Sequence, residues 1–290
     1  MSIRFRSRVP EGWTVDSAVR PFRFPGGEWH FAWPERETPV SAVLTGAEPD
    51  DLVLLALWAD VARERGVRSV AYIPYLPAAR ADRGTPFGAR VYANLINAAG
   101  LDEVVVFDPH SPVAPGLVDD VRIVHSASAV RDAVFGRHGL PGDYVGIIAP
   151  DAGARDRATR VAELVGLPVF TAEKHRDQAT GALLSYAPPT LPAHGRLLVV
   201  DDVCDGGATF VALAESTGVA RERLTLWVSH GIFSGRADRL TEHYGEIITT
   251  DSHPGARRPE IGARVIRLHP YLIHDDTSPG DPRNERGNER

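Results

Sequence analysis

The run from Leu197 to Thr209 restricts the possible folds of this chain more than any other segment. It starts with four apolar residues that indicate a buried strand, and two adjacent carboxylates, Asp201 and Asp202, follow. A third acid, Asp205, opens a glycine-rich loop, after which the sequence turns helical. A strand, a short loop and a helix N-terminus direct several backbone N–H groups to one point, which suits a phosphate monoester. The paired acids can accept hydrogen bonds from vicinal sugar hydroxyls, so the run predicts a sugar-phosphate site. Similar runs in other α/β proteins bind a metal or cap a helix, and the run alone leaves that alternative open.

Length and composition agree with two domains. The chain has 290 residues, too many for one small core and enough for two α/β domains of ordinary size. Hydrophobic residues make up 43%, which allows a full core and excludes a disordered chain. The net charge of −6 disfavours nonspecific binding of nucleic acid. Cys204 is the single cysteine, which excludes an intramolecular disulfide and a multi-cysteine metal site, and its small and acidic neighbours indicate a structural role.

No targeting or membrane segment is expected. The first residues lack the apolar region of a signal peptide, and no apolar run approaches the ~20 residues that span a bilayer. We therefore expect a cytoplasmic protein that contacts no membrane. Residues 274–290 contain nothing apolar to bury, and we predict a polar mobile tail there.

Strand and helix signals alternate along most of the chain. In the first half, apolar runs predict strands and helices at 40–44, 51–65, 69–73, 89–99 and 103–107. In the second half the same rhythm predicts elements at 144–148, 157–165, 168–170, 197–200, from 209, 224–228, 247–248 and 264–268. Alternating β and α units imply parallel sheets with helices on both faces, whose ligands lie at the carboxyl ends of the strands.

The spacing of the three acids and the small-residue loop resembles the phosphoribosyl-binding signature of the type I phosphoribosyltransferase fold. Over about residues 20 to 270, further segments in order resemble the ribose-phosphate diphosphokinase family, which makes phosphoribosyl diphosphate: Phe24–Glu28, Pro74–Asp82, Phe107–His110, Ala149–Gly153, Lys174–Arg176 and His230–Gly235. The resemblance implies an α/β fold with two phosphoribosyltransferase-like domains, each a parallel sheet flanked by helices. We expect the ATP side in residues 1–126 and the ribose-phosphate side in residues 127–273.

The resemblance assigns ribose-phosphate binding to the three acids and the loop after them: Asp201, Asp202, Asp205, Gly206, Gly207, Ala208 and Thr209. Lys174 and Arg176 stand two apart in an extended segment, so their side chains are expected to point the same way. Alone they are an ordinary surface pair. The resemblance places them on a mobile catalytic loop, where they neutralise charge on the transferring phosphoryl group.

The resemblance also implies ATP and magnesium contacts. Taken alone, the local sequence predicts that His110 lies in a capped turn and that Asp151 is a helix N-cap. The resemblance implies instead that the two residues share Mg²⁺, and that His110 is also a catalytic and ATP-binding residue. Arg80 and Asp82 form either an exposed ion pair or contacts to adenine and phosphate. The resemblance completes the adenine site with the ring of Phe24 and the carboxylate of Glu28, both from a neighbouring subunit. It therefore implies a homo-oligomer, either a dimer or a larger assembly.

Several departures from the family are visible. The usual strand and helix before Phe24 are absent or much shortened, and Gly206 stands where a threonine hydroxyl normally helps to hold the phosphate. The polar tail replaces a C-terminal segment that helps form the regulatory site, which puts control by phosphate and ADP in question. The segment from His230 to Gly235 is interpreted as a turn that packs the sheet.

The main hypothesis is a Mg²⁺-dependent transfer of the diphosphoryl group of ATP to the anomeric hydroxyl of ribose 5-phosphate. The missing hydroxyl at Gly206 keeps open the same chemistry on a larger ribosyl acceptor such as ADP-ribose. A third hypothesis is an inactive regulatory subunit that binds nucleotides, against which the presence of both Lys174 and Arg176 argues. A phosphoribosyltransferase is disfavoured, because one such domain suffices for that reaction.

Overall fold

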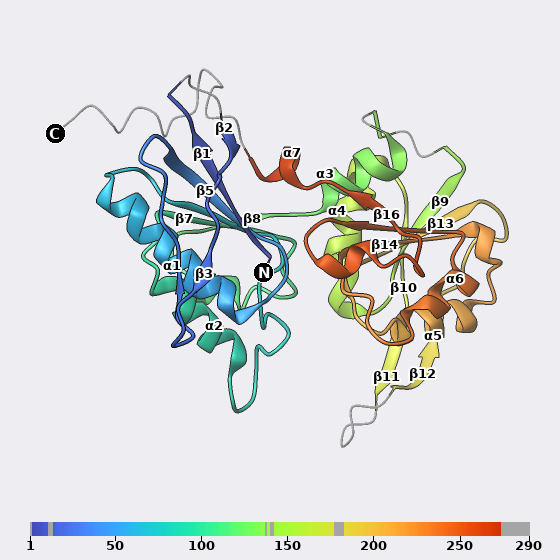
Figure 1. Cartoon of the computed structure of the whole chain (residues 1–290). Coiled ribbons are helices and arrows are strands. Elements are labelled where there is room, and N and C mark those ends of the chain that lie inside the picture. Colours follow the sequence, from blue (N-terminus) through green and yellow to red (C-terminus); the bar gives the residue numbers. More distant parts are fainter. Residues whose placement is uncertain (1, 11–13, 137, 140–141, 177–182, 274–290) are drawn as a thin grey trace.

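The structure is a computed structural model that describes residues 2–10, 14–136, 138–139, 142–176 and 183–273, without the side chains of 174–176 and 183–186. Two six-stranded sheets dominate it, one in each half of the chain (Figure 1). The predicted tail 274–290 lies outside the described residues. The predicted domain boundary between 126 and 127 falls just after the last strand of the first sheet and stays a prediction.

The first sheet has the strand order β2-β1-β5-β6-β7-β8. Its strands and the two helices packed on it are β1 (Ile3–Arg8), β2 (Thr14–Asp16), β5 (Thr38–Leu44), α1 (Pro49–Glu64), β6 (Val70–Ile73), α2 (Gly88–Asn97), β7 (Glu103–Phe107) and β8 (Val121–Val124). The four strands from β5 to β8 are parallel, as predicted, but β1 pairs antiparallel with both β5 and β2. The expectation of a wholly parallel sheet is therefore wrong at this edge. A strand does precede Phe24, because the alternating residues of β1 bury Ile3, Phe5 and Ser7 on one face.

The second sheet is parallel throughout, in the order β10-β9-β13-β14-β15-β16. Its elements are α3 (Ala127–Val130), β9 (Tyr144–Ala149), α4 (Arg155–Val165), β10 (Val169–Thr171), β13 (Arg196–Cys204), α5 (Ala208–Thr217), β14 (Leu224–Gly231), α6 (Leu240–His243), β15 (Glu246–Thr250), β16 (Arg264–Ile266) and α7 (His269–Leu272). The predicted strands and helices of both halves are all present close to their expected positions.

The apolar core is layered, and the two sheets share its middle layer. Val104 and Val106 of β7 pack on the α1 and α2 side, whereas Val105 and Phe107 face the second half and pack with Trp227 and residues of α4. A third cluster lies between the other face of the second sheet and α5 and α6. Both faces of β7 are therefore buried, which holds the carboxyl end of this strand against the second sheet.

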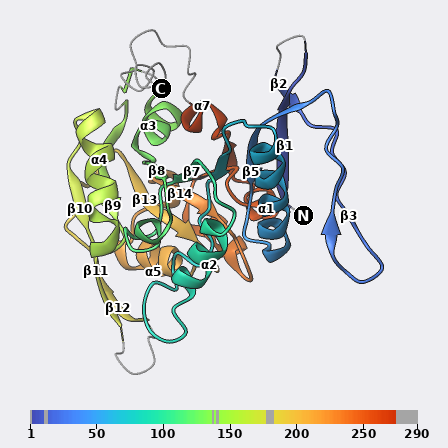
Figure 2. The same cartoon turned by 90° about the vertical axis from the view of Figure 1, so that its left-hand side faces the viewer.

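Two small hairpins extend from these sheets. The strands β3 (Phe22–Arg23) and β4 (Trp29–His30) form an arm that contacts α1 through β4, and Figure 2 shows β3 on the side of α1 remote from the second sheet. The strands β11 (Glu173–Arg176) and β12 (Leu183–Ala187) form the other hairpin. Among the described residues, no helix is long and apolar enough to cross a membrane.

Candidate functional site

The two acids Asp201 and Asp202 lie inside β13, and the prediction that the strand ends before them is wrong. Pairing with β14 continues alongside both acids as far as Cys204, which pairs with Gly231. The ladder continues because β14 itself runs three residues beyond the expected Val228. Asp202 is buried, with only 4% of its surface exposed. Two carboxylates in a paired strand have little freedom, so their positions are set before any ligand binds.

The loop after β13 leads directly into α5, as the sequence predicts. Gly207 is the N-cap with φ +79°, a left-handed conformation that favours glycine. The first N–H groups of a helix have no partner within the helix and can bind an anion. A Cβ at Gly206 would meet nothing within 4 Å, whereas one at Gly207 would lie 3.2 Å from Cγ of Leu240. The loop is therefore open at the first glycine and close-packed at the second.

Arg157, which belongs to none of the predicted site motifs, lies beside both acids. It comes from the first turn of α4, and its Nη1 atom is 3.5 Å from Oδ1 of Asp201 and 3.5 Å from Oδ1 of Asp202. Its Nε atom donates to Oδ2 of Asp108 at 2.8 Å. No sequence motif predicts that Arg157 lies beside the acids, since an arginine in a helix is usually exposed. Its burial in the structure is the feature that identifies it.

The electrostatics of the two acids differ. Burial and the negative charge of Asp202 raise the pKa of Asp201 well above its ordinary value, against the opposing charge of Arg157. Burial would also raise the pKa of Asp202, but the hydrogen bond from His110 and the charge of Arg157 outweigh it, so that pKa lies below the ordinary value. Asp202 is thus held ionised, ready to accept hydrogen bonds.

His110, from the first half of the chain, contacts Asp202 in the second half. Its Nδ1 atom lies 2.8 Å from Oδ2 of Asp202. This hydrogen bond raises the pKa of His110, with smaller contributions from the charges of Asp202 and Asp82. Because Nδ1 is engaged, Nε2 is the ring nitrogen that can face a ligand.

A second contact joins the same two regions. Nη1 of Arg80 lies 3.1 Å from Oδ2 of Asp205, and Oδ1 of Asp205 accepts from the hydroxyl of Ser234. The hydrogen bond from Ser234 lowers the pKa of Asp205, and Arg80 lowers it further. An ion pair of Arg80 with Asp82, one of the two alternatives for these residues, is not present among the described residues; Oδ2 of Asp82 accepts from the hydroxyl of Ser111 at 2.7 Å.

Asp151 acts as a helix cap. Its Oδ1 atom accepts from the N–H groups of Gly153 and Ala154 at 3.0 and 3.2 Å, the local role that the sequence also allowed. The described residues hold no group of three or more His, Cys, Asp or Glu side chains arranged for a metal. The charge of Asp151 nevertheless acts on Asp201, so it belongs to the same electrostatic cluster. The carboxylate of Asp151 supplies the kind of oxygen ligand that Mg²⁺ binds, and this ion keeps water and substrate phosphate as its other ligands.

Asp108 connects the two halves and was not predicted as a site residue. It follows β7 with φ +41°, unusual for a residue other than glycine, and it is 2% exposed. Its carboxylate accepts from Arg157 and from the hydroxyl of Ser229, and its carbonyl oxygen lies 3.3 Å from Nε2 of His230. His230 is buried and is, with Gly231, one of the last two residues of β14, so the segment from His230 to Gly235 begins as a strand and leaves the sheet only after Gly231.

Lys174 and Arg176 lie on β11, paired with β12. The register of the hairpin shifts between His175 and Arg176. The prediction that their side chains point the same way lies outside the described residues, since the structure describes only the backbone there. The hairpin extends away from the second sheet (Figure 1).

Phe24 and Glu28 lie on the arm of β3 and β4. Phe24 is 47% exposed and stacks on His30 at 5.6 Å between ring centroids. Within the described residues, no hydrogen bond or ring contact joins either residue to Arg80, Asp82 or His110. The chain thus does not bring these two residues to the rest of the predicted ATP site.

Cys204 ends β13 and is completely buried. Burial, together with the nearby charges of Asp201 and Asp205, raises the pKa of its thiol to about 12. The structural role predicted from its neighbours is confirmed, because a thiol of this pKa supplies no thiolate near neutral pH.

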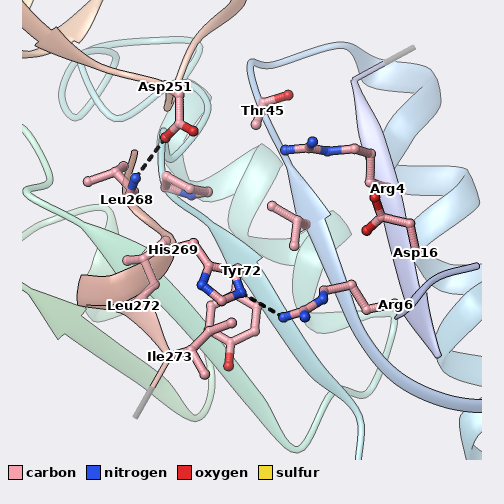
Figure 3. Close-up of a pocket in the computed structure, with 12 residues that line it drawn as sticks. Arg4, Arg6, Asp16, Thr45, Tyr72, Asp251, Leu268, His269, Leu272 and Ile273 are labelled. Atoms are coloured by element: carbon pink, nitrogen blue, oxygen red, sulfur yellow. Dashed lines mark hydrogen bonds between the residues drawn. The ribbon is translucent and has the colours of Figure 1, made fainter. Parts of the chain in front are cut away.

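A cavity of about 180 Å³ lies elsewhere, between β1 and the segment of α7 (Figure 3). Figure 3 shows Arg4 and Arg6 on one side and Leu268, His269 and Leu272 on the other, with Arg6 bonded to His269. Arg4 and Arg6 share this lining with the carboxylates of Asp16 and Asp251, so the cavity carries no clear charge preference. None of the predicted site residues lines it.

The two sheets, one parallel throughout and one parallel from β5 to β8, and the loop from the acids of β13 into α5 define a double-sheet α/β protein of the phosphoribosyltransferase type. Among solved structures, the chain is similar to the phosphoribosylpyrophosphate synthetase of Mycobacterium smegmatis, with a TM-score of 0.72 and 22% identity over 89% of this chain and 88% of that one. The fold predicted from the sequence is thereby confirmed.

Curated relatives carry the name ribose-phosphate pyrophosphokinase. Those of Saccharolobus solfataricus and Pyrococcus abyssi are each 30% identical, covering 76% and 80% of this chain and 78% and 83% of their own. That of Maricaulis maris is 32% identical and covers 76% of this chain and 73% of its own. No protein-family model matches the chain. The chain belongs to the ribose-phosphate pyrophosphokinase family, a family of diphosphoryl transferases.

Proposed function

We propose that the protein transfers the diphosphoryl group of ATP to the anomeric hydroxyl of ribose 5-phosphate, giving phosphoribosyl diphosphate and AMP. The observation that carries this proposal is the contact between the two sets of predicted residues. His110 and Arg80, from ATP-side segments, contact Asp202 and Asp205, from the sugar-phosphate segment, at 2.8 and 3.1 Å. A site built in this way can hold donor and acceptor within reach of each other.

The acceptor is held by the second half of the chain. Asp201 and Asp202 accept hydrogen bonds from the vicinal ribose hydroxyls, and the loop from Asp205 to Thr209 holds the 5-phosphate at the N-terminus of α5. The open space at Gly206 admits the phosphate close to the backbone. The anomeric hydroxyl then attacks the β-phosphorus, the bond to the α-phosphate oxygen breaks, and AMP leaves.

The donor is held by Arg80, Asp82 and His110, and Mg²⁺ by Asp151 and Nε2 of His110. When bound, the ion supplies charge neutralisation on the phosphate oxygens. Phe24 and Glu28 complete the adenine site of a neighbouring subunit, with the exposed Phe24 ring stacking on the base. The protein is therefore a homo-oligomer in this proposal.

Composition supports a specific role for the loop cation. Of the 32 lysines and arginines in the chain, Lys174 is the only lysine. Every other residue of the 32 is an arginine, so this position alone carries an ammonium group. An ammonium is a compact point charge, whereas the guanidinium of arginine is a planar fork, and the two groups are not interchangeable. Lys174 and Arg176 neutralise the transferring phosphoryl group, and a chain that keeps both is not an inactive regulatory subunit.

A second acceptor deserves a test because Gly206 leaves room beside the phosphate loop, where a Cβ would meet nothing within 4 Å. ADP-ribose carries a diester at the 5-position and needs that room. The deciding assay incubates the protein with ATP and Mg²⁺ plus either ribose 5-phosphate or ADP-ribose, and follows AMP release. We expect release with ribose 5-phosphate. AMP release with ADP-ribose but not with ribose 5-phosphate would make ADP-ribose the acceptor. AMP release with neither compound would contradict the proposed enzyme activity.

A further inference from the structure

We propose that Arg157, oriented by Asp108, is a positioning residue that holds Asp201 and Asp202 in the arrangement that receives the ribose hydroxyls. This inference rests on the proposed function. Arg157 touches neither substrate in it: it acts through the two carboxylates that do. The side chain of Arg157 is 10% exposed, and those of Asp201 and Asp202 are 14% and 6% exposed.

The guanidinium of Arg157 is fixed by two contacts before it reaches the acids. Its Nε donates to Oδ2 of Asp108 at 2.8 Å, and its Nη2 donates to the carbonyl of Pro109 at 3.3 Å. A guanidinium is planar, so two fixed nitrogens determine where the third lies. That third nitrogen, Nη1, lies at the same distance, 3.5 Å, from Oδ1 of both acids. It therefore restrains the pair rather than neutralising one member.

Asp108 is itself restrained from several directions. Its carboxylate accepts from the hydroxyl of Ser229, its N–H donates to the carbonyl of Val124 at 2.8 Å, and its carbonyl faces His230. Asp108 directly follows β7 of the first sheet, whereas the acids belong to β13 of the second. Through Arg157 the position of the sugar-binding pair is set relative to the strand that leads into His110.

A lysine cannot replace this arrangement. Its ammonium is a single point charge, which can pair with Asp108 or with the acids but cannot bridge both with fixed geometry. Arg157→Lys keeps the positive charge but removes the planar guanidinium, so we expect it to change the orientation of Asp201 and Asp202. We expect the KM for ribose 5-phosphate to rise about 10- to 100-fold, the loss of one or two charge-assisted hydrogen bonds. The KM for ATP and kcat should change much less.

The experiment measures both steady-state constants and the direct binding of ribose 5-phosphate by calorimetry without ATP. Arg157→Lys and Arg157→Ala are compared with Arg160→Lys. Arg160 is an exposed arginine one turn further along α4, so its replacement should leave all constants unchanged. Guanidinium ion, at concentrations that leave the fold intact, should restore sugar-phosphate binding to Arg157→Ala, and methylammonium should not.

The outcomes separate a positioning role from a structural one. Unchanged affinity for ribose 5-phosphate in folded Arg157 variants overturns the inference, and so does an equal loss of affinity for both substrates that guanidinium does not rescue. Asp108→Asn should raise the same KM, and combining it with Arg157→Lys should add little. A failure of the proposed function appears instead in the wild-type protein, as absence of AMP release.

Discussion

His110 and Asp202 are 92 positions apart in the sequence, and a hydrogen bond of 2.8 Å joins their side chains across the two halves of the molecule. The contact links a residue that follows the first sheet to an acid inside the second. Because the acid is buried and the imidazole is partly exposed, the pair combines a fixed acceptor with a group that can also face a ligand. Its strength should depend on the charge of the imidazole.

That dependence predicts how stability changes with pH. The folded-state pKa of His110 is raised above its ordinary value by Asp202, so the contact contributes stability below the unfolded pKa and loses it as the pH rises through the folded one. We expect the difference in Tm between wild type and His110→Ala, measured without metal, to be larger at about pH 6 than at about pH 9. His194→Ala, which removes an exposed histidine, is the control and should show no such trend. A difference that grows with pH would contradict the assigned contact.

Lys174 offers a test that most chains do not allow. As the only lysine it is the only side-chain amine, so amine acetylation modifies it and, besides it, only the N-terminal amine. We expect Lys174→Ala and acetylation to lower kcat by on the order of 100-fold or more, because the cation acts mainly in the transition state. The affinity for ribose 5-phosphate should hardly change.

Two comparisons sharpen this expectation. Reductive methylation keeps the charge of Lys174 and should preserve more activity than acetylation. Lys174→Arg should remain impaired, since a planar guanidinium does not reproduce a compact ammonium. A change confined to KM in Lys174→Ala would remove this residue from the catalytic role.

The fold follows from the sequence further than the site does. Apolar runs and glycine stops place the strands and helices, because burial and helix ends depend on local residues. The length of β13 does not follow, because its pairing beyond Val200 depends on β14. The contacts of Arg157 and the left-handed conformation of Asp108 come from packing between the sheets, and no local pattern encodes them. Sequence motifs therefore predict candidate ligand residues, but they do not predict Asp108 and Arg157, which contact these residues in the structure.

Cys204 should be unreactive in the folded protein. Its thiol is buried and has a pKa of about 12, so almost no thiolate forms at about pH 8. We expect a thiol reagent to label the native protein only at the rate of unfolding and to label one thiol at once in denaturant. Ribose 5-phosphate should slow the native reaction, because a ligand of the folded state lowers the unfolded fraction. Rapid native labelling would contradict the burial of β13 at this end.

The two loop glycines should respond differently to substitution. At Gly207 the backbone has φ +79° and a Cβ would contact Leu240, so Gly207→Val should lower Tm as well as remove acceptor binding. Thermal unfolding of the variant, with Gly206→Val as the matched comparison, distinguishes the two positions.

At Gly206 an added Cβ would meet nothing within 4 Å, which makes Gly206→Thr a suitable test of the acceptor. The added hydroxyl can donate to a phosphate monoester, so affinity for ribose 5-phosphate should stay the same or improve while Tm is unchanged. For a diester such as ADP-ribose the same side chain occupies the path of the second phosphate, and affinity should fall. Gly206→Val has the same shape without the hydroxyl, so any gain that depends on hydrogen bonding must disappear in it. Calorimetry measures the binding of both acceptors to the wild type, Gly206→Thr and Gly206→Val. This comparison separates the steric effect of the side chain from the effect of its hydrogen bond. If both acceptors respond equally to Gly206→Thr, the open space at this glycine has no bearing on the choice of acceptor, and the larger substrate loses its structural support.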